Sequence, residues 1–306
     1  MPLWQRFEFS VNVTEDTVTD SRAYMKLLQW NIQWCRGMDG AVDAARIARV
    51  AKQIADPDVA CFQEVAINFP TLAGSTGEDQ VALLRREFPG YAAVFGVGVE
   101  VPDGKGGRRQ FGNLILSRLP LRQSYRHTLP WPPDAGTPSM PRVAVEAVIE
   151  APFGLVRVIT THLEYYSARQ RMAQAERLRE THAEACAHAK SASSAQYRSG
   201  PFEPFERPTS AILTGDFNMK VDDPACVRLL EPFENGTPRF MDGWQVANRQ
   251  APQPATFHVH ETDPAKQPYC CDFVFVTEDL APRIRSVKVD VDTKASDHQP
   301  VVLELD

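Results

Sequence analysis

Short groups of polar residues stand beside several apolar segments of the chain, and their side chains are of types that can hydrolyse a phosphate ester. They are Asn31, Glu64, His162, Asp216 with Asn218, Asp272, and Asp297 with His298. Carboxylate and amide oxygens are the ligands that a hard divalent cation such as Mg²⁺ prefers. A carboxylate can also activate water, and histidine can donate to phosphate oxygens that gain negative charge. Together these residue types predict metal-assisted hydrolysis.

Each of these residues also has an ordinary structural interpretation when it is taken singly. Glu64 can be a loop carboxylate after a strand, and the pair Asp297 and His298 can cap a turn. The functional interpretation therefore rests on the whole set and on its repeated position beside predicted strands.

Other segments admit both kinds of interpretation. The segment 102–112, PDGKGGRRQFG, includes Arg108 and could grip phosphate, but the tip of a solvated hairpin explains it equally well. His258 and His260 alternate along one segment and lack a third ligand of matching spacing. A rim or structural role is favoured for these two histidines over a metal site.

The elements that must position the polar groups are short strands alternating with amphipathic helices. Strands are predicted over residues 27–30, 59–62, 91–95, 114–117, 143–150, 155–160, 211–213, 272–275, 284–291 and 301–304. Helices are predicted around residues 47–54 and 81–88 and over about residues 167–190, where apolar residues recur on one face. This alternation favours a layered α/β or α+β body.

Composition and charge exclude some classes of protein. Of the 306 residues, 43% are hydrophobic and 24% are charged, which is ordinary for a globular domain. The formal net charge of −6 does not favour broad nucleic-acid binding through Lys and Arg, although a nuclease that uses a bound cation is compatible with it. No apolar run approaches the roughly 20 residues of a membrane span, and the N-terminus has no secretory signal pattern.

The cysteines indicate a reducing environment. None of them forms a C-x-x-C pair, and Cys270 and Cys271 are adjacent, which is a poor arrangement for an ordinary disulfide. Reduced thiols and a cytoplasmic location are therefore expected.

Five short motifs follow one another along the chain. They are WNIQW with Asn31, FQEV with Glu64, THLE with His162, GDFN with Asp216 and Asn218, and SDHQP with Asp297 and His298. In this order and spacing they resemble the endonuclease/exonuclease/phosphatase superfamily, whose fold is that of deoxyribonuclease I. The resemblance runs from about Lys26 to the C-terminus. One such motif is a weak signal, whereas five in the family's order are a strong one.

The resemblance implies a four-layer sandwich of the α/β (α+β) class, in which two mixed sheets pack face to face between helices. The strand-end groups of both sheets would converge at one edge. Residues 25–306 are expected to form this single catalytic domain. Residues 1–24 lack the apolar periodicity of a core element and are expected to be a loosely ordered extension or to come from an upstream start codon, although the alternating Phe7, Phe9 and Val11 would also suit an edge strand.

The resemblance also implies the metal ligands and the members of the catalytic set. Glu64 would bind the metal directly, with Asn31 beside it and Asp297 contributing. Gln33 stands where some relatives carry a further acidic residue, so chemistry with one metal is favoured.

The remaining matched residues would act on water and on the substrate. Asp216 would orient or deprotonate the attacking water, and Asn218 would hold that water or a phosphate oxygen. His298 would stabilise charge on the phosphate, and Asp272 would support a histidine. Substrate binding is expected of His162 and Asn218 and is proposed for Arg108 as well.

The implied activity is Mg²⁺-dependent hydrolysis of a phosphate ester, above all a phosphodiester, by direct attack of water, with Mn²⁺ as a substitute metal. One alternative is a DNA endonuclease or exonuclease. Another is a non-catalytic binding module on the same fold, against which the presence of Glu64, Asp216, Asn218 and His298 together argues. The expected partner is the phosphate-ester substrate, either small or a nucleic acid, and no obligate protein partner is evident.

Overall fold

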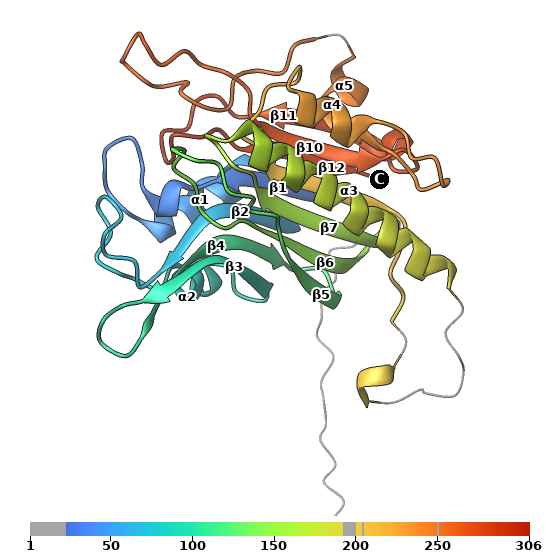
Figure 1. The fold of residues 1–306 in the computed structure, drawn as a ribbon, viewed down its shortest axis with the longest axis horizontal. Helices are drawn as coiled ribbons and strands as arrows, with labels where there is room; N and C mark the ends of the chain where they lie inside the picture. Colours follow the sequence, from blue (N-terminus) through green and yellow to red (C-terminus); the bar gives the residue numbers. More distant parts are fainter. Residues whose placement is uncertain (1–22, 192–199, 204, 250) are drawn as a thin grey trace, which may run out of the picture.

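Two mixed sheets of six strands each pack face to face, with helices on their outer sides (Figure 1). The structure is a computed structural model that describes residues 23–191, 200–203, 205–249 and 251–306. The predicted four-layer sandwich is therefore confirmed. Residues 1–22 of the extension predicted over residues 1–24 lie outside the described residues. The loosely ordered extension and the domain boundary at residue 25 therefore stay predictions.

The first sheet has the strand order β11-β12-β1-β2-β4-β3. Its strands are β1 (Met25–Asn31), β2 (Val59–Ile67), β3 (Ala92–Pro102), β4 (Arg108–Ser117), β11 (Ile284–Val289) and β12 (Val301–Leu305). β1 and β2 are parallel neighbours in the middle of the sheet. Because both of their faces are covered, they are nearly continuous buried runs rather than alternating ones.

The second sheet has the strand order β5-β6-β7-β8-β10-β9. Its strands are β5 (Leu121–Thr128), β6 (Val143–Ala151), β7 (Gly154–His162), β8 (Ala211–Asp216), β9 (Phe240–Asp242) and β10 (Asp272–Thr277). β7 and β8 are the parallel pair of this sheet, and β10 runs antiparallel to β8. Each sheet thus has one parallel pair near its centre.

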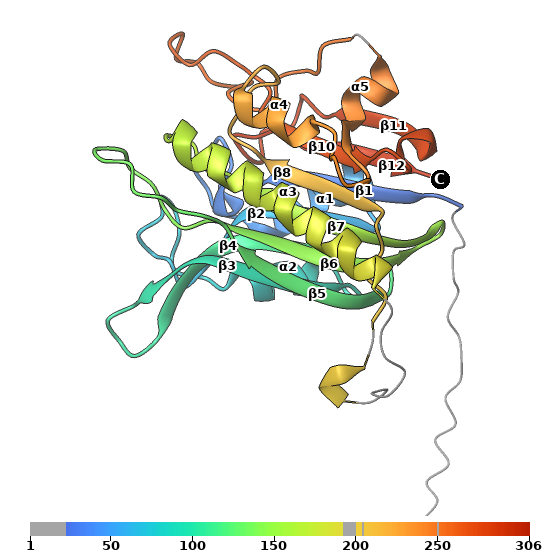
Figure 2. The same ribbon diagram turned by 45° about the vertical axis from the view of Figure 1, so that its right-hand side comes forward.

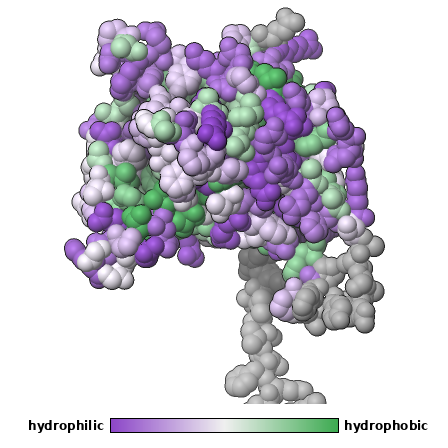
Figure 3. Space-filling model, viewed as in Figure 1, coloured by the Kyte–Doolittle hydropathy of each residue, from purple (hydrophilic) through white to green (hydrophobic). Residues whose placement is uncertain are grey.

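The core between the sheets is apolar, and two further apolar clusters lie beneath the helices. α1 (Ala44–Ile54) and α2 (Gln80–Glu87) cover the first sheet, and α3 (Ala168–Lys190) and α4 (Pro224–Leu230) cover the second (Figure 2). α5 (Gly243–Asn248) follows β9 directly. The outer surface over α3 is largely hydrophilic (Figure 3). In the described part of the chain, no helix is long and apolar enough to cross a membrane.

Helix starts follow from local sequence. In each of these five helices the residue before the first turn accepts a hydrogen bond from a backbone N–H of that turn, which otherwise has no intrahelical partner. These capping residues are Asp43, Asp79, Ser167, Asp223 and Asp242.

Two strands were not predicted from the sequence. β5 is an edge strand with the polar sequence LRQSYRHT, and β9 has only three residues, so neither shows a clear apolar period. β3 extends to Pro102 and pairs there with Arg108 of β4. The hairpin interpretation of residues 102–112 is therefore confirmed.

A buried carboxylate holds the helix-facing side of the second sheet together. Glu146 of β6 is fully buried and accepts two hydrogen bonds of 3.2 Å from Arg207, while His127 Nε2 lies 3.0 Å from its Oε2. Arg157 Nη1 of the neighbouring strand lies 3.8 Å away. Burial alone would raise the pKa of Glu146, but the bond from His127 and the charges of Arg157 and Arg207 lower it to about 2.

We expect Glu146→Gln to lower the free energy of unfolding at neutral pH by about 3 kcal/mol, the equivalent of this pKa difference. Because the folded pKa is depressed, the native protein has the full contribution above the ordinary pKa of 4.5 and loses it as the pH falls towards about 2. Urea unfolding at several pH values checks this. Glu150→Gln, on the same strand but 45% exposed, is the control and should change little. Equal losses in both variants would contradict the assignment.

Candidate active site

The strand ends of both sheets meet at one edge of the sandwich and carry the polar residues that the sequence indicated. Asn31 is the last residue of β1, in register with Gln63 of parallel β2. In the second sheet His162 ends β7 beside Asp216, which ends β8. Asp272 begins β10 opposite Asp216, because that strand runs antiparallel. Parallel neighbours end at the same edge of a sheet, so the topology itself collects these side chains.

Glu64 reaches this edge through a bulge in β2. The pairing of β2 with β4 shifts between Phe62 and Val65, and Glu64 has a positive φ of 59°. Regular alternation would direct its side chain to the face of Phe62, which packs in the core beneath the helices. The bulge instead re-aims the carboxylate towards the site, as bulges beside active sites commonly do.

The amide of Asn31 joins the two sheets. Its Nδ2 donates to Oε1 of Glu64 and to Oδ2 of Asp216, both at 3.0 Å. Its Oδ1 accepts from the backbone N–H of Gln33 at 3.1 Å. In this orientation Asn31 positions two carboxylates and turns its oxygen away from them, so direct metal ligation by Asn31 stays a proposal.

Asp216 lies at the centre of the group. Its Oδ1 accepts from the backbone N–H of Asn218 at 2.9 Å, and its Oδ2 lies 3.4 Å from Nε2 of His162. Asn218 has a φ of 50° and turns back, so that its Nδ2 lies 3.0 Å from the same Nε2. A Cβ at Gly215 would stand 2.0 Å from the carbonyl oxygen of Thr161, so only glycine lets the two strands approach this closely beside the site.

His298 is held by Asp272. Its Nδ1 lies 2.9 Å from Oδ2 of Asp272, and its Nε2 lies 3.6 Å from Oδ2 of Asp216. Asp272 also accepts from Gln29 at 2.9 Å and from Thr256 at 2.6 Å. The histidine ring is therefore fixed with Nε2 towards the centre of the site, and the carboxylate that fixes it has further partners of its own.

Burial and charge shift the pKa values of the site residues in different directions. Burial raises the pKa of Glu64 to about 7, and the charge of Asp297 adds to this. Burial also raises the pKa of Asp216 to about 6, against the attraction of His298.

The two histidines differ in protonation. Burial alone would lower the pKa of His298, but Asp272 and Asp216 outweigh it and raise the pKa to about 10. Burial and the charges of Arg142 and His298 lower the pKa of His162 well below its ordinary value. At neutral pH the site thus holds one cationic and one neutral imidazole, and strongly perturbed groups of this kind gather at functional sites.

Glu64 and Asp297 form the oxygen-rich side of the site. Gln33 Nε2 donates to Asp297 at 2.6 Å, and Asp297 in turn raises the pKa of Glu64. Oε1 of Glu64 lies 4.0 Å from Nδ1 of His162. The lowered pKa of His162 leaves that imidazole uncharged at neutral pH. Two carboxylates that repel one another fit a hard divalent cation.

Several supporting residues were missed in the sequence analysis. Arg142 is 7% exposed, lies 3.3 Å from Glu164, and helps to lower the pKa of His162. Glu164 belongs to the THLE motif and could have been found there. Arg142 has no local signal, because it stands one residue before β6 and reaches the site only through the pairing of β6 with β7. Gln29 also has no local signal, because in the sequence it is only a polar residue within an apolar strand.

Two of the weaker sequence candidates stand apart from Asp216. Arg108 lies on the β3–β4 hairpin, where its Nε is 3.1 Å from Oε1 of Glu100. No recorded contact of the described residues joins it to the catalytic group, so its role in substrate binding stays a proposal. His258 stacks on Phe257 with ring centroids 3.7 Å apart, and Phe257 stacks on His298 at 4.4 Å. This places His258 beside the site without a direct contact to its carboxylates.

Solved structures from several organisms are similar to this chain along most of its length. An endonuclease/exonuclease/phosphatase from Beutenbergia cavernae DSM 12333 is 25% identical, with a TM-score of 0.67, and the match covers 93% of this chain and 72% of that one. A mannosyl-6-phosphatase from Bacteroides thetaiotaomicron VPI-5482 is 17% identical, with a TM-score of 0.63 and coverage of 92% and 99%. The human Nocturnin catalytic domain is 18% identical, with a TM-score of 0.57 and coverage of 93% and 95%.

The family comparison agrees with the geometry. A search of curated proteins gave no match. The sequence model of the Endonuclease/Exonuclease/phosphatase family, whose members are generally phosphoester hydrolases, matches residues 28–298. That range begins in β1 and ends at His298, so it spans every strand end that builds the site. The chain therefore belongs to the endonuclease/exonuclease/phosphatase family.

Proposed function

We propose that this protein is a Mg²⁺-dependent phosphodiesterase that cleaves its substrate by direct attack of water. The observation that carries the proposal is the position of Asp216, which is 1% exposed and whose Oδ2 lies within 3.6 Å of both His162 and His298. A carboxylate held in this way can accept a proton from water. A protein that only binds phosphate has no need of such a group.

Glu64 and Asp297 would hold the cation, with Asn31 beside them. When bound, Mg²⁺ supplies positive charge to a phosphate oxygen and makes the phosphorus easier to attack. Asn31 has a separate task, because its two hydrogen bonds of 3.0 Å hold Glu64 and Asp216 on either side of one amide group. One carboxylate is thereby available to the metal and the other to water.

Asp216 and Asn218 would act on the attacking water. Asp216 would take the proton of the water as its oxygen bonds to phosphorus and the P–O bond to the leaving group breaks, while the Asn218 amide would hold the water or a phosphate oxygen in line. Cationic His298 donates its Nε2–H to the phosphate, on which negative charge grows. Neutral His162 faces the same space and would donate its ring N–H to the phosphate or to the leaving group.

The alternatives use the same site on other substrates. A DNA nuclease would need contacts with several phosphates, and the formal net charge of −6 does not favour these. A phosphomonoesterase is the second alternative, because the mannosyl-6-phosphatase shares the fold. A non-catalytic module is disfavoured because binding alone does not require Asp216, Asn218 and His298 together.

A substrate panel separates these possibilities. The protein with Mg²⁺ is assayed against a bis-aryl phosphodiester, an aryl phosphomonoester, duplex DNA and single-stranded DNA, with Asp216→Asn as the control for contaminating activity. We expect the diester to have the highest kcat/KM. Preferred turnover of DNA or of the monoester would replace the proposal by the corresponding alternative. No turnover of any substrate would favour the binding module.

We expect Glu64→Gln to weaken Mg²⁺ activation, because the amide keeps the shape of the side chain and loses its charge. The Mg²⁺ concentration for half-maximal activity should rise by roughly tenfold or more, and the maximal rate should fall. Mg²⁺ titrations of activity measure both effects, and Glu150→Gln serves as the matched surface variant. Thermal unfolding in chelator should be nearly unchanged. Undiminished turnover of the native protein in chelator would exclude metal-dependent catalysis.

Asp216→Asn and His298→Ala should each lower kcat by roughly 100-fold or more, with little change in KM. Because both residues act in one transition state, the double variant should lose much less than the product of the two single losses. Steady-state kinetics of the three variants test this. Thermal melts of the same samples show whether a loss reflects unfolding. Near-normal turnover in either single variant would rule out its assigned role.

A further inference from the structure

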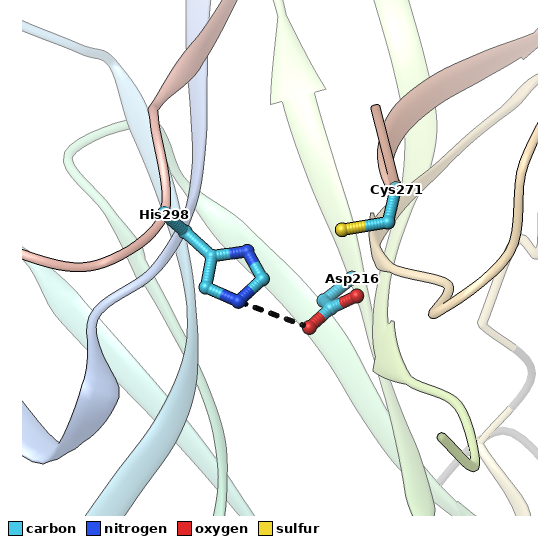
Figure 4. Close-up of side chains that lie close together, drawn as sticks. All are labelled: Asp216, Cys271 and His298. Carbon is cyan, nitrogen blue, oxygen red and sulfur yellow. Dashed lines mark ion pairs between the residues drawn. The ribbon is translucent and has the colours of Figure 1, made fainter. Parts of the chain in front are cut away.

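A thiol borders the site on a side that the proposed hydrolysis does not use. Cys271 immediately precedes β10 and is fully buried. Its side chain points towards the space between Asp216 and His298 (Figure 4). One ligand atom from each of these three residues lies within 4.8 Å of the other two. A carboxylate, a thiol and an imidazole thus face one point. This group does not include Glu64, the proposed ligand of Mg²⁺.

One pair of ligand atoms already has the spacing of a tetrahedral metal centre. Sulfur, nitrogen and oxygen ligands lie 2.0–2.3 Å from Zn²⁺, so neighbouring ligand atoms are roughly 3.5 Å apart. Asp216 Oδ2 and His298 Nε2 are already 3.6 Å apart. The third ligand atom, Cys271 Sγ, donates to Oδ2 of Asp272 at 3.5 Å, so the thiol has to turn from that carboxylate to complete the group around an ion.

The surroundings of His298 suit a metal ligand. Its Nδ1 is held at 2.9 Å by Asp272, which leaves Nε2 for an ion. Histidines that bind metals almost always have such an outer partner, which orients the ring. Asp272 is in turn held by Gln29 and Thr256, so the arrangement is supported before any ion binds.

The donor set selects the ion. Mg²⁺ prefers oxygen ligands and keeps several waters, whereas thiolate and imidazole together favour Zn²⁺ and related soft or borderline ions. The Glu64–Asp297 side and the Cys271 side of the site therefore suit different cations. Asn31 separates them, because its amide lies between Glu64 and Asp216.

We propose that Asp216, Cys271 and His298 form a second cation site for a thiophilic divalent ion such as Zn²⁺, and that an ion there stops hydrolysis. The ion displaces the thiol proton and one ring proton to solvent, forms bonds to sulfur, nitrogen and oxygen, and keeps its oxidation state. It occupies both the carboxylate that would take the water proton and the imidazole that would face the phosphate. Binding does not depend on the proposed function, whereas the inhibition rests on it.

The neighbouring thiol is a matched control. Cys270 is partly buried, and its Sγ faces the backbone oxygen of Asp272 at 3.7 Å. It belongs to the same two-residue sequence but not to the group around Asp216. Cys271→Ser and Cys270→Ser therefore remove the same chemical group from adjacent positions. Cys271→Ala is the second variant if the serine impairs folding.

Metal binding is measured first, without substrate. Co²⁺ is added in one equivalent to the Mg²⁺-saturated protein, and thiolate-to-cobalt charge-transfer absorption is recorded. We expect the band in the native protein and in Cys270→Ser, and its loss in Cys271→Ser. Absence of the band from the native protein, or its survival in both Cys271 variants, would overturn the site whether or not the protein is an active hydrolase.

Inhibition is measured second, on the best substrate of the panel at saturating Mg²⁺. Zn²⁺ should inhibit the native protein, and further Mg²⁺ should not relieve the inhibition. The inhibiting concentration should rise by at least roughly tenfold in Cys271→Ser and stay unchanged in Cys270→Ser. Relief by Mg²⁺ together with an unchanged response of Cys271→Ser would place the inhibiting ion at Glu64 and refute the inhibitory role.

Discussion

The amide group of Asn31 is the point on which the site depends, because it bonds to a carboxylate from each sheet. Glu64 of the first sheet and Asp216 of the second both accept from its Nδ2 at 3.0 Å. Stacked sheets lie about 10 Å apart, and the amide of Asn31 bridges them at the edge where β1 and β8 end. A slip of one residue in β1 would turn Asn31 to the opposite face and separate the two carboxylates.

A layer of polar side chains lies between the apolar core and the site, on the inner faces of the strands. In each of β1, β2, β7 and β10 an apolar core residue has a polar residue two positions nearer the site on the same face of the sheet. The pairs, apolar residue first, are Leu27 and Gln29, Cys61 and Gln63, Val158 and Thr160, and Val274 and Asp272. Hydrogen bonds link these four residues. Gln63 donates to Thr160, and Gln29 donates both to Gln63 and to Asp272. Because buried polar groups are costly without partners, this chain of bonds helps to make the polar edge compatible with an apolar core, although Oε1 of Gln29 has no hydrogen-bond partner among the described residues.

This layer explains how a cationic imidazole stays buried. His298 lies between Asp272 and Asp216, so its positive charge is balanced on two sides while burial opposes it. The same balance makes the group available to different ligands. A phosphate would meet a positive imidazole, whereas a thiophilic ion would replace the proton by a metal charge and gain the sulfur of Cys271.

The amino-acid sequence by itself determined the alternation of strands and helices and indicated most of the candidate site, because parallel pairing brings the ends of neighbouring strands to one edge. It also indicated the hairpin over residues 102–112. Only the tertiary structure decided the path of Glu64, which depends on a bulge against β4, and the places of Arg142 and Cys271, which depend on pairing between strands. The physical reason is that a local pattern records periodicity and turn chemistry, whereas register and strand order arise from contacts between residues far apart in the chain.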